Sequence, residues 1–241
     1  MGITTPQRKQ PTKAEHSVSA YADESIAPNI IVCAAAVFPV EQVSSAETSL
    51  ASMKDALRLS PATPLHCRIV FNGSERKRHP EWKNVSPKAI NSVIKALCVG
   101  LSGISHRPIV VVAKPTSVVI PRVPGDEPKD AILDAKGQVA IGFQTLGYHL
   151  TRVYGYGATK LWLDPDRTKI PWLKGKTQAN LTRSPFMDLG PDIEPPKFEP
   201  IIETGPKPRL LEIADLYAYI TAQAHMGGVV GSIGGFKNSI P

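Results

Sequence analysis

The chain has 241 residues, 42% of them hydrophobic, and a formal net charge of +7. This length can bury a proper core, and no linker separates two apolar blocks, so a single domain is expected. The three cysteines are widely spaced and form no Cys-x-x-Cys pair, which indicates neither a disulfide framework nor a cysteine zinc site and favours a reducing, cytoplasmic setting. No apolar run of about 18 residues is present to span a membrane, and the positive charge favours an anionic partner such as nucleic acid.

The two ends of the chain differ in composition from its middle. Residues 1–16 are rich in Thr, Pro, Gln and Lys and are predicted to form a disordered basic arm. Residues 227–241 form a glycine-rich tail whose glycines match no phosphate-binding spacing. The folded domain is therefore expected between residues 17 and 226.

An acidic pair lies in the first predicted strand, Ser17-Val-Ser-Ala-Tyr-Ala-Asp23-Glu24-Ser25. Alternation of side chains places Tyr21 and Asp23 on one face and Ala22 on the other. Glu24 can join Asp23 only if the strand ends at Asp23 and the chain turns, so Asp23 is the better functional candidate. The ordinary interpretation of such a dipeptide is a solvated pair at the end of a strand.

Several elements follow with clear local signals. The apolar run 29–38 predicts a buried strand that forms an antiparallel hairpin with the first. Ser44 or Ser45 is expected to cap a helix that runs to about Leu59, and Ser86-Pro87 opens a helix that ends at Gly103. The β-branched run 108–113 predicts a strand in the interior of a sheet that is covered on both faces.

The second half of the chain predicts fewer regular elements. The stretch 115–128 carries four prolines and is expected to be a loop. A helix is predicted over 129–154 and a strand over 159–164, which ends in Asp164 directly before Pro165. An edge strand over 198–203 and a helix over 208–225 complete an α/β fold.

Residues 165–200 show no secure periodicity, and so long a loop inside a compact domain is usually functional or disordered. We expect a flap that grips an anionic substrate through basic side chains, among them Arg167, Lys169, Lys174 and Lys176. A second basic cluster surrounds Trp82 and comprises Arg76, Lys77, Arg78 and Lys83. These residues suit phosphate contacts and base stacking, but a solvated basic loop explains them equally well.

The final helix contains a carboxylate in apolar surroundings. Asp215 lies within Ile-Ala-Asp-Leu, where a charge is costly unless it is paired or bound to a cation. Glu212 and Tyr219 share its side of the helix. An aspartate that accepts hydrogen bonds from a neighbouring loop is the alternative. For His66, metal ligation or proton transfer is conceivable, and an ordinary hydrogen-bonded histidine is the default interpretation.

Three carboxylates thus occupy comparable places: Asp23 and Asp164 at strand ends, and Asp215 on a helix that can pack nearby. Clustered acids repel one another and call for a cation, and oxygen ligands select Mg²⁺ or Mn²⁺. A two-metal site suits in-line displacement at phosphorus. The sequence therefore predicts a metal-dependent nuclease or phosphodiester hydrolase that acts on RNA, DNA or a hybrid.

Four segments together resemble the family called domain of unknown function 3800: Tyr21-Ala-Asp23-Glu24-Ser25, Leu65-His66, Leu163-Asp164 and Glu212-Ile-Ala-Asp215-Leu. The resemblance spans residues 19 to about 222 and implies a ribonuclease H-like fold, a mixed β-sheet with helices on both faces. It also implies that Asp23, Asp164 and Asp215 bind metal, with Glu24 and His66 in support. Pro64 and Glu212 stand where family members usually carry Glu and Gln.

Two other functions are compatible with the same residues. The first is a non-catalytic module that binds nucleic acid or protein, which salt-sensitive binding without cleavage would indicate. The second is a hydrolase of a small phosphorylated substrate, which a deep closed pocket would indicate. The oligomeric state does not follow from the sequence.

Overall fold

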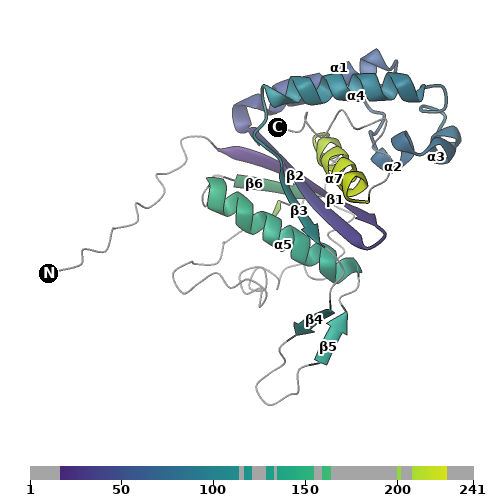
Figure 1. Ribbon diagram of the computed structural model, residues 1–241. Helices are drawn as coiled ribbons and strands as arrows, with labels where there is room; N and C mark the ends of the chain where they lie inside the picture. The colour runs from purple at the N-terminus through teal and green to yellow at the C-terminus, as the bar shows by residue number, and fades with distance from the viewer. Residues whose placement is uncertain are drawn as a thin grey trace.

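The computed structural model describes residues 17–113, 117–120, 129–132, 135–154, 159–163, 200–201 and 208–226. Within these ranges the chain is an α/β protein with one open, mixed β-sheet that carries helices on both faces (Figure 1). The predicted arm at residues 1–16, nearly all of the predicted flap at 165–200 and the tail at 227–241 lie outside the described residues. None of the described helices is long and apolar enough to cross a membrane.

The sheet has the strand order β3-β2-β1-β6-β7. β1 (Val18–Ala27) and β2 (Ile30–Pro39) form the predicted antiparallel hairpin, in register from Val18–Pro39 to Ala27–Ile30. The turn between them places Asn29 at a φ of 59°, a left-handed conformation that Asn tolerates better than most residues. β6 (Thr159–Leu163) pairs with β1 in parallel, and β7 (Pro200–Ile201) pairs with β6 in parallel.

β3 (Ile109–Ala113) is an edge strand, so its predicted interior position is wrong. It pairs antiparallel with β2 alone among the described strands. Its apolar run has another cause: Val110 and Val112 pack against the core cluster on one face, and Ile109 and Val111 pack against the cluster on the other. An edge strand that is covered on both faces has the same continuous apolar sequence as an interior strand.

The first half of the chain forms four α-helices, of which the first and the last were predicted and the two short ones between them were not. They are α1 (Val43–Ala56), after the 3-10 turn η1 (Val40–Gln42), α2 (Cys67–Phe71), α3 (Gly73–Arg78) and α4 (Pro87–Ser102). The Ser86 side chain caps α4 by accepting the Ala89 N–H, as predicted. The predicted serine cap of α1 is wrong, because η1 leads directly into the helix and no side chain caps it.

The region after β3 departs from the predictions. Ser117–Ile120, expected in a loop, forms β4, and Lys129–Ile132, expected in a helix, forms β5. These two strands pair with each other in a separate antiparallel sheet. α5 therefore begins at Ala135 and runs to Tyr154. Prolines next to β4 and β5 suggested a structureless loop, but the β-branched residues between them form a strand.

Two apolar clusters fill the space on either side of the sheet. The first lies between the sheet and helices α1, α4 and α7 (Leu211–His225), and includes Tyr21, Leu50 and Ile94. The second lies between the sheet and α5 and includes Ala22, Cys33 and Leu146. In Figure 1, α7 (yellow) and α5 (green) lie on opposite sides of the central strands. We refer to these sides as the α7 face and the α5 face.

Candidate functional site

β1 does not end at the acidic pair. It runs on to Ala27, because β2 offers an apolar partner strand along its whole length, and so Asp23 and Glu24 lie within the strand. The predicted strand end at Asp23 is therefore wrong. The predicted alternation is confirmed: Tyr21 belongs to the cluster on the α7 face, and Ala22 belongs to the cluster on the α5 face.

Asp23 and Glu24 consequently point to opposite faces of the sheet. Glu24 pairs in register with Cys33, and residues directly opposite each other in an antiparallel pair share a face. The Cys33 thiol points to α5, since its Sγ lies 3.8 Å from the Val139 carbonyl. Glu24 is thus on the α5 face, and the structure does not bring it to the side of Asp23. Both acids are buried, at 8% exposure for Asp23 and 5% for Glu24.

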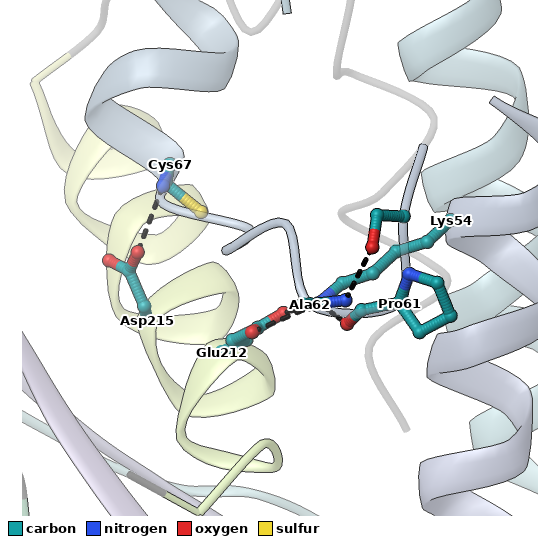
Figure 2. A network of polar contacts seen from close by, with 7 residues as sticks. Lys54, Pro61, Ala62, Cys67, Glu212 and Asp215 are labelled. Atoms are coloured by element: carbon teal, nitrogen blue, oxygen red, sulfur yellow. Dashed lines mark hydrogen bonds and ion pairs between the residues drawn. The ribbon is translucent and has the colours of Figure 1, made fainter. Parts of the chain in front are cut away.

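Asp215 lies on the first half of α7 and is held by the start of α2. Its Oδ2 accepts the Cys67 backbone N–H at 2.9 Å, and Nδ1 of His66 lies 3.1 Å from the same oxygen. Figure 2 shows the Cys67 contact, with the other oxygen of Asp215 turned away from it. The Asp215 side chain is 13% exposed, whereas that of His66 is 56% exposed. Both of these partners lie in the loop and helix that pack on α7, as the hydrogen-bonded interpretation of Asp215 expects.

The Cys67 thiol connects Asp215 with Asp23. Burial raises its pKa well above the usual range, and the negative charges of Asp215 and then Asp23 raise it further. A thiol on α2 thus lies within electrostatic reach of a carboxylate on α7 and another on β1. Asp23, which alternates with Tyr21 and pairs with Ala34, and Asp215 of α7 therefore lie on the same face of the sheet, where α7 packs on β1, and the exposed His66 lies next to Asp215.

A buried ion pair lies next to this place and was not anticipated from the sequence. Lys54 of α1 is 1% exposed, and its Nζ lies 2.8 Å from Oε2 and 3.0 Å from Oε1 of Glu212 (Figure 2). The same ammonium donates to the Pro61 carbonyl at 3.2 Å. The available signal was the position of Lys54, one turn after Leu50 within the apolar stripe of α1. Glu212 is therefore paired with α1, one turn before Asp215 on α7.

Several predicted site residues cannot be placed relative to these acids. Asp164, Arg167, Lys169, Lys174 and Lys176 lie outside the described residues. β6 ends at Leu163, which pairs in register with Ala22, the residue before Asp23. Asp164 is the next residue in the sequence.

The basic cluster at residues 76–78 forms the second half of α3 and not a loop. Asn72 caps this helix by accepting the N–H groups of Ser74 and Glu75. Nη1 of Arg76 donates to the Val70 carbonyl at 2.7 Å, and Arg78 pairs with Glu75 at 3.1 Å. Lys77 is exposed.

Trp82 does not belong to this exposed surface. Its side chain is fully buried in the cluster on the α7 face, so its indole offers no ring to a nucleic-acid base. The predicted stacking role of Trp82 is wrong. Burial of a large apolar side chain contributes more free energy than burial of a small one, and Trp82 anchors the α3–α4 connection to the core. The basic residues on either side of it in the sequence made a surface position look more plausible.

Within the described ranges, no group of three or more His, Cys, Asp or Glu side chains is arranged to hold a metal ion. Asp23 and Asp215 share the α7 face, and both provide oxygen ligands of the kind that Mg²⁺ and Mn²⁺ prefer. No protein-family model matches this chain, and no curated protein or solved structure is significantly similar to it.

Proposed function

We propose that this chain is a divalent-metal-dependent nuclease or phosphodiester hydrolase on a ribonuclease H-like fold. Asp23 and Asp215 would hold Mg²⁺ or Mn²⁺, and Asp164, the residue after β6, would add a third carboxylate. The observation that carries the proposal is that Asp23 of β1 and Asp215 of α7, far apart in the sequence, lie on the same face of the sheet, where α7 packs on β1. Neighbouring carboxylates repel one another, and a bound cation would offset that repulsion.

The sheet topology supports the proposal. β1 carries Asp23 and lies between the antiparallel β2 and the parallel β6. α7 packs on β1 and β2 and brings Asp215 to that face. A first-strand acid and a final-helix acid on one face of a mixed sheet is the arrangement that the four family-like motifs imply.

The hydrogen bonds of Asp215 suit a metal ligand. Oδ2 is fixed by the Cys67 N–H and lies next to His66. The contacts of Asp215 with Cys67 and His66 both involve Oδ2, so Oδ1 would be the oxygen offered to a cation. Partners that hold one oxygen of a ligating carboxylate orient the other, and such outer contacts tune metal affinity.

The side chains around the acids have distinct roles in this proposal. A bound divalent ion would polarise the phosphoryl group and activate water. His66, mostly exposed and next to Asp215, orients that carboxylate and can exchange a proton with solvent. α3 presents Arg76, Lys77 and Arg78, whose charges suit a phosphate backbone.

Calorimetric titration of Mn²⁺ into the wild type and into Asp215→Asn tests the metal claim. We expect binding by the wild type and at least a 10-fold loss in the variant, together with loss of Mn²⁺-dependent cleavage of single-stranded and duplex RNA and DNA. Asp55→Asn makes the same charge change at an exposed position on α1 and is the control. Absence of Mn²⁺ binding by the wild type would contradict the proposal and favour a non-catalytic nucleic-acid-binding module.

A further inference from the structure

An aromatic pair lies one helical turn beyond the acidic site. Phe71 follows Cys67 by four residues on α2, and Tyr219 follows Asp215 by four residues on α7. The rings of Phe71 and Tyr219 are stacked, with centroids 5.2 Å apart and planes inclined by 7°. Four residues advance a helix by about 6 Å. α2 and α7 therefore meet at two successive levels, first through Cys67 and Asp215 and then through the two rings.

Tyr219 is electrostatically part of the same site. Burial raises the pKa of its phenol, and the nearby Cys67 thiol and Asp215 carboxylate raise it further. Both rings are only partly buried and pack at the margin of the core cluster on the α7 face. Tyr217 and Trp82, by contrast, are almost wholly enclosed in that cluster. The Phe71–Tyr219 pair is thus attached to the core while both residues keep part of their surface exposed, and because each ring covers one face of the other, a ligand would meet the outer side of the pair.

The basic helix α3 adjoins this pair. Phe71 is the last residue of α2, and Asn72 caps α3 directly after it. The guanidinium of Arg76 turns back onto the Val70 carbonyl at 2.7 Å, next to Phe71. A guanidinium has five N–H donors, so this bond leaves Arg76 able to contact an anion. Carboxylates, stacked rings and cations therefore follow one another over α7, α2 and α3.

We infer that Phe71 and Tyr219 form a stacking platform for an unpaired base of the substrate, with α3 contacting the phosphate backbone beside it. The inference rests on the proposed nuclease function and assigns single-stranded nucleic acid as the substrate class. Bases inside a duplex are covered by their neighbours, so only an unpaired base can lie on an aromatic side chain. Stacking on a ring tolerates every base, so the platform selects strand state and not sequence.

Binding measured without cleavage tests the platform. Fluorescence anisotropy in EDTA would compare a labelled single strand of about ten nucleotides, within the usual range of site sizes, with a hairpin duplex of similar length. We expect Tyr219→Leu to bind the single strand about 5- to 100-fold more weakly than the wild type and the duplex unchanged. Tyr219→Phe, which keeps the ring, should bind like the wild type.

Tyr154→Leu is the matched control, because Tyr154 is a partly buried tyrosine near the end of a helix on the α5 face. It should bind both ligands like the wild type. The inference is overturned if Tyr219→Leu binds the single strand as tightly as the wild type, if Tyr219→Leu loses duplex binding equally, or if the wild type binds no single strand.

The same variants separate this inference from the proposed function. Tyr219→Leu reports on binding in the absence of metal, whereas Asp215→Asn reports on Mn²⁺ binding and cleavage. If Asp215→Asn cleaves like the wild type while Tyr219→Leu still loses single-strand binding, the proposed function fails and the platform stands. If cleavage depends on Asp215 but Tyr219→Leu binds normally, the nuclease stands and the platform fails.

Discussion

The two faces of the sheet are built on different principles. On the α7 face, polar groups cross between elements: Lys54 of α1 reaches Glu212 of α7, and the start of α2 holds Asp215. On the α5 face, close apolar packing dominates: Gly142 of α5 lies directly over Cys33 of β2, although the buried Glu24 also belongs to this face. A single strand, β1, supplies both faces by alternation. The difference teaches that chemistry can be confined to one side of a sheet while the other side supplies rigidity.

Neighbouring acids on β1 give the sharpest test of this comparison. Asp23→Asn should lower metal-dependent cleavage by at least about 100-fold, because even the loss of an outer partner of a metal ligand costs about 10- to 100-fold. Glu24→Gln makes the same change one residue further, on the α5 face, and should lower cleavage far less. Steady-state cleavage rates at saturating Mn²⁺ would be compared after circular dichroism confirms both folds.

An equal loss in the two variants would contradict the assignment of function to the α7 face alone. It would instead favour the expectation from the family resemblance that Glu24 supports the metal site. Unchanged cleavage in both variants would remove the nuclease proposal altogether.

The ion pair of Lys54 and Glu212 tests how the α7 face is held together. Lys54→Met should destabilise the fold by about 3–5 kcal/mol, because it leaves the Glu212 carboxylate buried beside apolar helices without its cation. The double variant Lys54→Met/Glu212→Gln removes the stranded charge and should recover most of this loss. Urea denaturation of the three proteins gives the free energies of unfolding.

A loss below about 1 kcal/mol for Lys54→Met would place the pair among ordinary surface ion pairs. The polar network on the α7 face would then be a feature of the site and not a support of the fold.

Local sequence signals were sufficient for the elements whose ends they mark. Ser86 and Pro87 gave the start of α4, and the apolar run after Pro28 gave the β1–β2 hairpin. Non-local pairing decided what these signals could not. β1 continues past Asp23 because β2 lies alongside it, and Ser117–Ile120 becomes a strand because β5 pairs with it. Register and pairing partners are set by the whole fold and only weakly by one segment.

The candidate site was predictable in part for the same reason. The apolar surroundings of Asp215 indicated a paired carboxylate, which the Cys67 N–H and His66 provide. Glu24 lies on the α5 face because β1 continues past Asp23, and Trp82 is buried because of tertiary packing. Neither outcome could be predicted from the neighbouring residues in the sequence. The position of Lys54 within the apolar stripe of α1 indicated a buried lysine. Its partner Glu212 is distant in the sequence, so the pattern of α1 could not identify it.

The substitution Gly142→Ala is expected to change the free energy of unfolding least among these variants, and it tests the packing on the α5 face. A Cβ at this position would lie 2.5 Å from Cys33 Sγ and 3.4 Å from its Cβ, so Gly142→Ala forces α5 away from β2. The expected destabilisation is about 1–3 kcal/mol, the usual cost of overpacking a core. Gly100→Ala is the control, since a Cβ at Gly100 of α4 meets no atom within 4 Å, and it should be neutral or slightly stabilising.

The cause of the Gly142→Ala effect can be assigned through Cys33. If the clash with the thiol is responsible, adding Cys33→Ala should offset much of the loss, and a double-mutant cycle of thermal or urea unfolding should give a coupling energy of about 0.5–3 kcal/mol. Additive effects would mean that the backbone of β2, and not the thiol, limits the approach of α5. Cleavage per folded molecule should stay unchanged in the Gly142 and Cys33 variants, because they alter the α5 face and not the face that carries the proposed site.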